Sequence, residues 1–307
     1  MPKRRVYRTE KGWLRSRSRS IGASESAAIL GVGYTSQSAY TVWQQKCWPA
    51  NPDSDAPTIE MRVGQIIEPA LREIFRTTTG LDIRPLHHKH DRVVYQHDDH
   101  PWLRATLDAQ VESERAVVEL KNVGEHLGKE WGNNSVPLKF QVQVQHQMLV
   151  RGWHHGYVCA LIGGRTPIVR KVEANERFQA KMLEKLAEFW QCVESREPPP
   201  IDGSYATREA LARQHPTDDG TTVDLSADCT LLADRLDVLR EEKRTIDDQI
   251  RAAENKLKAE IGDSVAGRLA DGTTLAWTSH QRGGYTVDPT TYRRFRRLTT
   301  QHEGDRT

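Results

Sequence analysis

The sequence is poor in the features that mark secreted, membrane-bound or cysteine-ligated metal proteins. Its four cysteines stand far apart in 307 residues and form no C-x-x-C pair, which disfavours an iron–sulfur cluster. The mean hydropathy is −0.69 without a long apolar stretch, so we expect no transmembrane span. Residues 3–20 are basic rather than apolar, which predicts no signal peptide and, most simply, a cytoplasmic protein. The histidines do not have the spacing of a common structural zinc site, although five of them stand at 87, 88, 90, 97 and 100.

An excess of one charge is also lacking, because the formal net charge is only +2. Its distribution is uneven. Residues 1–20 contain eight Lys or Arg against one Glu, and four arginines cluster within 293–297. Basic clusters at both ends suit contacts with phosphate groups, whose binding is driven by counterion release. Solvated basic tails explain the same pattern, so composition is consistent with nucleic-acid binding but does not discriminate.

Two carboxylates and a lysine stand at a spacing that suits metal-assisted hydrolysis of phosphodiesters. Ten residues separate Asp108 from Glu119, and Lys121 follows two residues later. The flanking runs, 104–111 and 116–121, alternate apolar and polar residues around a polar stretch, so they predict a β-hairpin. Because residues two apart on a strand share a face, the side chains of Glu119 and Lys121 converge.

Oxygen atoms from this motif suit a hard divalent cation such as Mg²⁺. The carboxylates of Asp108 and Glu119 and the backbone carbonyl of Leu120 make a partial octahedral set that water and phosphate complete. Lys121 would orient the attacking water or stabilise charge on the phosphate. An edge strand with Glu and Lys on its solvent face gives the same pattern, which also arises by chance in a chain that is 28% charged. The motif alone therefore does not establish a nuclease.

Two predicted helices flank the motif and add polar residues. Apolar residues between 63 and 75 lie on one helical face, and Glu68 on this helix can offer a third carboxylate. The alternative for Glu68 is a first-turn glutamate that the helix dipole favours. Residues 137–150 carry four glutamines among apolar residues, and a helix places Gln143 and Gln147 on one face. That polar stripe either faces a site or is a solvated amide face.

Further motifs frame this core in a fixed order. From the amino end they are Trp13 to Gly31, Ser38 to Trp43, Gly64 with Glu68 and Pro69, Asp108, Glu119 to Lys121, Val136 to Gln143, Tyr157 to Gly164, and Phe189 to Val193. Each motif is weak singly. Their order, over roughly residues 13 to 203, resembles the YqaJ viral recombinase family, relatives of phage lambda exonuclease within the PD-(D/E)XK nuclease superfamily.

The resemblance implies roles for the residues of the central motif. Asp108 and Glu119 would be metal ligands, and Glu68 an additional acid at a second metal ion. Lys121 would be the catalytic lysine, and Gln143 a glutamine that positions it. These roles come from the family and not from the spacing itself.

The resemblance also implies a site for the 5′-phosphate of a DNA end. Arg17 and Ser24 fall where the family holds that phosphate. Arg15 and Arg19 form a ladder with Arg17, which leaves the assignment of the arginine open, with Arg17 preferred. The sequence also departs from the family pattern at Leu107, which stands in place of the proline that names the superfamily. This position supplies no metal ligand.

The implied activity is digestion of linear double-stranded DNA. By resemblance it needs Mg²⁺, with Mn²⁺ as a substitute and two ions at the site. It would proceed 5′ to 3′ and leave a 3′ overhang for a single-strand annealing protein, in a bacterial cytoplasm and from a phage or prophage gene. Lambda exonuclease forms a ring trimer, so a homo-oligomer is implied. Two alternatives stay open: a metal-dependent endonuclease or nickase of the same superfamily, and a non-catalytic DNA-binding recombination accessory.

The sequence predicts two domains joined by a loop. Residues 1–205 are expected to form an α/β nuclease domain of the restriction-endonuclease-like PD-(D/E)XK type, with a central mixed sheet flanked by helices. Residues 206–222 contain clustered Pro, Asp and Gly and are expected to be a linker. Residues 223–307 are expected to form an appendage without a catalytic pattern.

The appendage shows a heptad-like pattern. Apolar residues recur at three- and four-residue steps and predict a long amphipathic helix that ends at Gly262, with Lys243 as the one gap. A β-hairpin turned at Asp271 and Gly272 and a short basic helix over 289–297 are expected to follow. Packing, oligomerisation and binding to DNA or a partner are all open roles for this region.

Overall fold

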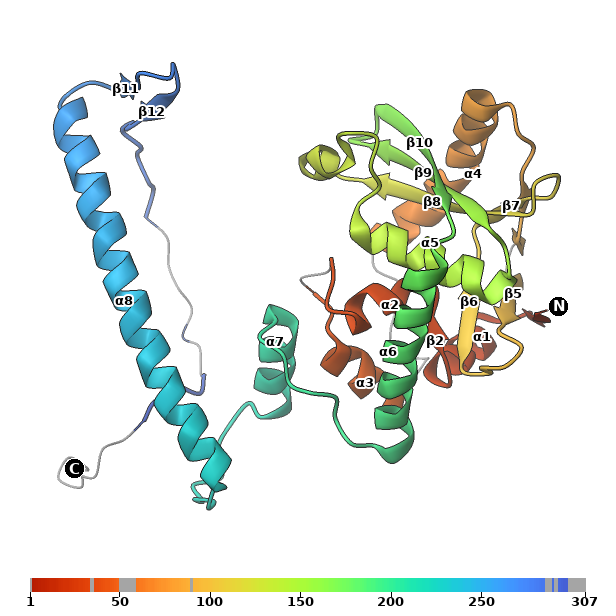
Figure 1. The fold of residues 1–307 in the computed structure, drawn as a ribbon, viewed down its shortest axis with the longest axis horizontal. Coiled ribbons are helices and arrows are strands. Elements are labelled where there is room, and N and C mark those ends of the chain that lie inside the picture. The colour runs from red at the N-terminus through yellow and green to blue at the C-terminus, as the bar shows by residue number, and fades with distance from the viewer. Residues whose placement is uncertain are drawn as a thin grey trace. The chain divides into compact units, whose positions relative to one another are not determined.

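The structure, a computed structural model, describes residues 2–33, 36–49, 59–88, 91–284, 289 and 292–297. The chain forms two compact units, Met1–Arg213 and Gln214–Thr307. The larger unit holds two mixed sheets, and the smaller unit is dominated by one long helix (Figure 1). No helix in the described ranges combines the length and the apolar character that a bilayer crossing requires.

The first sheet of the larger unit has the strand order β10-β9-β8-β7-β3. Its strands are β3 (Arg84–Pro85), β7 (Ala109–Val111), β8 (Ala116–Val123), β9 (His155–Ile162) and β10 (Thr166–Glu173). β8 and β9 are parallel, and the other neighbours are antiparallel. Strand alternation places Val118 and Leu120 of β8 with α4 (Ile59–Thr79), and Val117 in the cluster that includes α5 (Leu138–Arg151). The predicted mixed sheet flanked by helices is confirmed.

A second sheet has the order β1-β5-β6-β2, and β4 also pairs with β5. Its strands are β1 (Lys3–Tyr7), β2 (Ile21–Gly22), β4 (His87–His88), β5 (Asp91–Gln96) and β6 (Leu103–Thr106). β2 and β6 are parallel, with Ile21 opposite Leu103. This pairing brings the helices on either side of β2, α1 (Glu10–Ser18) and α2 (Ala23–Ile29), beside the strand that leads to Asp108.

The predicted hairpin is divided between the two sheets. β7 and β8 pair antiparallel as predicted, but the first predicted run, 104–111, is two strands, because β6 belongs to the second sheet and β7 to the first. The break falls at Leu107 and Asp108. Leu107 is fully buried, and the Asp108 carboxylate accepts a hydrogen bond of 2.8 Å from the Leu120 N–H. Alternation of apolar and polar residues predicts which side chains of a strand are buried, but it does not predict which strand will be its partner in a sheet.

The other helices of the larger unit are α3 (Ala39–Cys47), the 3-10 helix η1 (Glu125–Trp131), α6 (Glu176–Ser195) and α7 (Tyr205–Gln214). α7 buries Ala206, Thr207 and Ala210, and the Thr207 hydroxyl donates to Ser38 Oγ at 2.8 Å. The segment 206–222, expected as a linker, therefore begins with a packed helix, and the larger unit ends at Arg213. Small side chains allow this close packing without a strong apolar pattern.

The smaller unit contains α8 (Ala227–Ile261) and the hairpin of β11 (Ala266–Arg268) and β12 (Thr274–Ala276). Gly262 follows the helix, and Gly272 has φ of +86° in the hairpin turn, both as predicted. The basic helix expected over 289–297 is wrong for the residues described there, 289 and 292–297, which are not helical. Arg297 instead forms ion pairs of 2.8 Å with Asp234 and Asp237 of α8.

His146 of α5 joins three elements of the larger unit. Its ring is fully buried, with Nδ1 2.6 Å from Ser26 Oγ of α2 and Nε2 2.9 Å from the Arg104 carbonyl of β6. A carbonyl can only accept, so Nε2 carries the proton of the neutral ring and Nδ1 accepts from the serine hydroxyl. Burial lowers the pKa of His146 to about 4.

We expect His146 to make folding sensitive to mild acid. The unfolded chain protonates this histidine near pH 6.5 and the folded chain only near pH 4, so its contribution to stability is complete above about pH 6.5 and is lost as the pH falls toward 4. Between pH 7 and pH 5 the free energy of unfolding should fall by on the order of 2 kcal/mol through this group. Urea titrations should show a smaller fall for His146→Gln, and an identical pH dependence would contradict the prediction.

Gly156 of β9 lies where no side chain fits between β8 and α5. A Cβ there would overlap the Val117 side chain and lie 3.0 Å from Val144 Cγ1. Gly156→Ala should therefore lower the free energy of unfolding by about 1–3 kcal/mol. Gly64→Ala, in α4 with no atom near the added methyl, should raise it by about 0.5–1 kcal/mol. Urea denaturation of both variants measures this, and a neutral Gly156→Ala would show that the contact relaxes.

Candidate functional site

Glu119 is the most enclosed acid of the first sheet. It lies on β8 with only 2% of its surface exposed, facing the polar stripe of α5. Gln143 and Gln147, one helical turn apart, each donate Nε2 to one of its carboxylate oxygens at 2.6 Å. Lys121 Nζ lies 2.6 Å from Glu119 Oε1. The two amides and the ammonium fix the carboxylate in place, because each of its oxygens receives at least one donor from a packed element.

Asp108 stands beside this cluster at the junction of the two sheets. Its Oδ2 accepts the Leu120 N–H, and the Leu120 side chain is buried in the cluster against α4, as expected from its strand position. Burial raises the pKa of Asp108 well above its ordinary value, and the negative charge of Glu119 raises it further, while Lys121 opposes this shift. A buried acid, Glu119, and a partly buried acid, Asp108, are therefore held close together.

Glu68 is near this pair but is engaged elsewhere. It lies on α4 and forms an ion pair of 2.6 Å with Arg72, one turn away. Burial raises the pKa of Glu68, the Arg72 guanidinium lowers it, and Glu119 adds a smaller upward effect. The structure thus brings Glu68 within electrostatic reach of Glu119 but directs its carboxylate to Arg72.

The donor set fits a hard divalent cation. Asp108 and Glu119 offer carboxylate oxygens, the ligands that Mg²⁺ prefers, and a cation between them would remove the repulsion that raises the Asp108 pKa. Among the residues described, no three His, Cys, Asp or Glu side chains are gathered closely enough to form a metal site by themselves. Water and phosphate oxygens would have to complete the coordination, as is usual for Mg²⁺.

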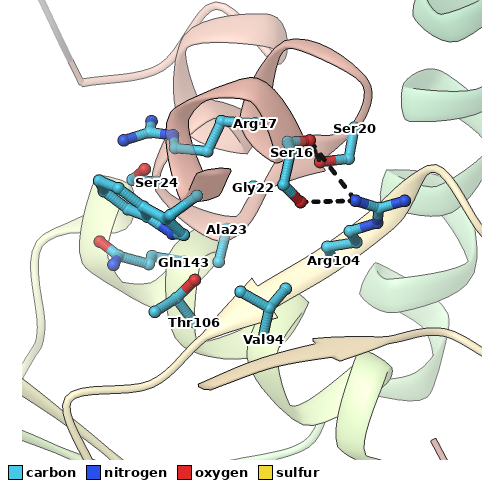
Figure 2. Close-up of a pocket in the computed structure, with 11 residues that line it drawn as sticks. Ser16, Arg17, Ser20, Gly22, Ala23, Ser24, Val94, Arg104, Thr106 and Gln143 are labelled. Atoms are coloured by element: carbon cyan, nitrogen blue, oxygen red, sulfur yellow. Dashed lines mark hydrogen bonds between the residues drawn. The ribbon is translucent and has the colours of Figure 1, made fainter. Parts of the chain in front are cut away.

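A small cavity of about 70 Å³ opens beside Gln143, one of the two amide partners of Glu119. Its walls come from α1, α2, β5, β6 and α5, and Figure 2 shows the residues that line it. Arg17 and Ser24, the two residues assigned to phosphate by resemblance, both line it, whereas Arg15 and Arg19 do not. Gln143 lines it as well, so one glutamine contacts Glu119 and also borders the cavity.

A buried ion pair supports the position of Arg17. Glu25 of α2 accepts from Arg17 Nη2 at 3.2 Å and from Lys46 Nζ at 2.8 Å. Burial alone would raise the pKa of Glu25, but Lys46 and Arg17 outweigh it, and the net pKa is lowered. The Arg17 guanidinium also lies over the Trp13 ring, 5.2 Å from its centroid. Arg17 is thus held at the cavity by an acid and an aromatic ring.

Sequence reasoning missed several residues of this region. Gln147 belongs to the predicted polar stripe but not to the predicted site residues, although it contacts Glu119 as closely as Gln143 does. Arg104 and Thr106 of β6 line the cavity; Arg104 donates to Ser16 Oγ at 2.7 Å and so ties β6 to α1 (Figure 2). Strand alternation from Asp108 was the available signal, because Arg104 and Thr106 stand four and two residues before it.

Comparison with known proteins places this site in context. The chain is 25% identical over 263 residues to the uncharacterized protein YqaJ of Bacillus subtilis (strain 168), an alignment that covers 84% of this chain and 80% of that protein.

Solved structures of low identity are also similar in part. An alkaline exonuclease from Laribacter hongkongensis is 14% identical with a TM-score of 0.49, covering 66% of this chain and 98% of that one. A phage-related exonuclease from Haemophilus somnus 129PT is 9% identical with a TM-score of 0.40, covering 64% and 96%.

A family model, that of the YqaJ-like viral recombinase domain, matches residues 12–154. This segment begins beside Trp13 and includes Arg17, Asp108, Glu119 and the glutamines of α5. The resemblance that the order of motifs predicts is therefore confirmed over this segment: residues 12–154 match the model of the YqaJ-like viral recombinase domain.

Proposed function

We propose that this protein is a metal-dependent recombination exonuclease that hydrolyses phosphodiester bonds from the ends of linear double-stranded DNA. The observation that carries the proposal is the pair of neighbouring acids, buried Glu119 and partly buried Asp108, with Lys121 in contact with Glu119 and a cavity that both Arg17 and Gln143 line. A protein that only binds DNA gains nothing from buried acids near phosphate, because they repel it.

Asp108 and Glu119 would hold the metal ions, Mg²⁺ or Mn²⁺ and two in number by resemblance, with the Leu120 carbonyl and Glu68 as further ligands. The bound ions would supply an activated water and stabilise the leaving oxygen. For Glu68 to take part, its ion pair with Arg72 has to open. Lys121 would orient the water or neutralise charge that builds on the phosphate. Gln143 and Gln147 would keep Glu119 in one orientation, which pre-organises the site.

The cavity would receive the 5′-phosphate of the DNA end. Arg17 would bind it through its guanidinium and Ser24 through its hydroxyl. Arg104 would act indirectly by fixing α1 through Ser16. Capture of a terminal phosphate beside the acids favours attack on a bond near that end, which supports 5′ to 3′ digestion and a 3′ overhang.

The further assignments follow from the resemblance. The 3′ overhang would serve a single-strand annealing protein, the enzyme would work as a homo-oligomer in the bacterial cytoplasm, and its gene would be of phage or prophage origin. Comparing linear with covalently closed duplex DNA, each with Mg²⁺, separates the exonuclease from an endonuclease or nickase. Cleavage of closed circles at the same rate as linear DNA would overturn the proposal.

Asp108→Asn, Glu119→Gln and Lys121→Ala should each lower the rate of Mg²⁺-dependent DNA hydrolysis by about 100-fold or more, because each removes ligand charge or a catalytic donor. Gln147→Leu should lower it less, since Gln143 and Lys121 still hold Glu119. Glu73→Gln, on the exposed side of α4, is a matched control and should keep full activity. Wild-type turnover by a folded Asp108→Asn protein would refute the site.

Arg17→Ala should slow digestion of 5′-phosphorylated ends by about 10-fold or more, with Ser24→Ala weaker, while digestion of unphosphorylated ends changes little. Arg15→Ala and Arg19→Ala remove the same charge from positions of the same helix region that do not line the cavity, and are the controls. Rates on duplexes that differ only in the 5′-phosphate give the ratio. An equal loss on both substrates would assign Arg17 to general DNA binding or to folding through Glu25.

A further inference from the structure

The helix α8 leaves an apolar stripe without a partner in the described part of the chain. None of its 35 residues is buried there. Leu232, Leu239, Ile246 and Ile250 have between 44% and 69% of their surface exposed. Surface helices normally bury such a stripe, because the stability of an amphipathic helix comes mainly from packing of its apolar face.

The stripe follows a heptad repeat. Core a positions fall at Cys229, Leu236, Lys243, Ile250 and Leu257, and core d positions fall at Leu232, Leu239, Ile246 and Ala253. Spacing of three and four residues over this length is the pattern of a coiled coil rather than of packing against a sheet. A single lysine at an a position helps to set the register and orientation of a coiled coil, because pairings that bring two ammonium groups into the same core layer are disfavoured.

The described tail residues contact the outer face of α8 and one residue, Arg240, that flanks the apolar stripe. Arg297 pairs with Asp234 and Asp237, and the Phe295 ring lies 6.0 Å from the Arg240 guanidinium. Asp234 and Asp237 stand at heptad positions f and b, away from the core positions. The described tail residues therefore leave the apolar stripe uncovered.

The charged residues that flank the apolar stripe distinguish between a parallel and an antiparallel pairing of α8 with α8 of a second copy. In a parallel, in-register pair, Lys243 would meet Lys243 of the second copy, Arg235 would face Arg240, and Glu242 would face Asp247. All three contacts are repulsive. A parallel homodimer is therefore disfavoured by the same residues that flank its core.

The antiparallel pair centred on residue 241 reverses every one of these contacts. Arg235 then faces Glu242 of the second copy, and Arg240 faces Asp247, each twice by symmetry. Lys243 meets Leu239, so the two ammonium groups separate and reach solvent past an apolar side chain. The remaining core layers pair Leu236 with Ile246, and Leu232 with Ile250.

We propose that α8 is the surface through which two copies of this protein associate, as an antiparallel coiled coil centred on residue 241. The inference makes the proposed homo-oligomer specific and does not depend on nuclease activity. It assigns the smaller unit to assembly, because the helix that dominates this unit supplies the whole interface.

A disulfide tests the register on the full-length protein. The antiparallel layer sets Cys229 against Ala253 of the second copy, so Ala253→Cys should form a cross-link between Cys229 and the introduced thiol at position 253 under mild oxidation. Within one chain these two positions are about 36 Å apart along the helix, so the link has to join two chains. Peptide mass mapping identifies the pair. A Cys229–Cys229 link would show a parallel pair and overturn the proposal, as would the absence of any cross-link through position 253.

Charge exchange provides the second test, read by sedimentation. Arg240→Asp sets like charges against Asp247 in both symmetric contacts and should weaken self-association by about tenfold. The double variant Arg240→Asp with Asp247→Arg should restore it. Arg244→Asp makes the same change on the outer face, beside Glu241, and should leave the solution mass unchanged. Loss of association in the single variant without rescue in the double variant would refute the pairing.

Discussion

The larger unit is organised around the need to satisfy one buried carboxyl group, that of Glu119, inside a packed sheet. A buried carboxylate is costly unless each oxygen receives a donor, and α5 supplies two donors from residues one turn apart. This requirement fixes the rotation and the height of α5 over β8. The apolar residues of that helix then fall into the core, with Val144 beside Val117 and Gly156 at the closest approach.

The same helix also borders the cavity. Gln143 borders the cavity, and His146 is bonded to α2, which carries Ser24, and to β6. Glu119 and the cavity are therefore positioned by one helix rather than by two separate elements. In the proposed enzyme, the grip on a DNA end and the alignment of the reacting bond would be parts of a single geometry.

Local sequence patterns predicted most helices and strands, because the periodicity of a helix or strand can be recognised within about a dozen residues. The strand β8, the long helix α8 and the hairpin after it follow this rule. The division of residues 104–111 between two sheets did not follow, since it depends on pairing with β5 and β8. α7 was missed for a related reason: Ala206 and Ala210 are buried only because α7 packs against the rest of the larger unit.

The candidate site shows the same limit. The acids, Lys121 and the glutamine stripe stand in recognisable spacing, but the partner of each is set by tertiary contact. Nothing local indicates that Glu68 turns to Arg72, or that Arg104 ties β6 to α1 rather than facing solvent. The ion pair of Glu25 with Lys46 joins residues 21 positions apart and was likewise invisible.

One consequence concerns the junction at Leu107 and Asp108, where the chain passes from one sheet to the other. Because Asp108 is the crossing point and Glu119 belongs wholly to the first sheet, the spacing of the two carboxylates depends on the angle between the sheets. Leu107, fully buried at this crossing, packs in the core of the larger unit. In the proposed enzyme, a larger or smaller side chain at position 107 would thus shift the two carboxylates relative to one another without altering any proposed ligand.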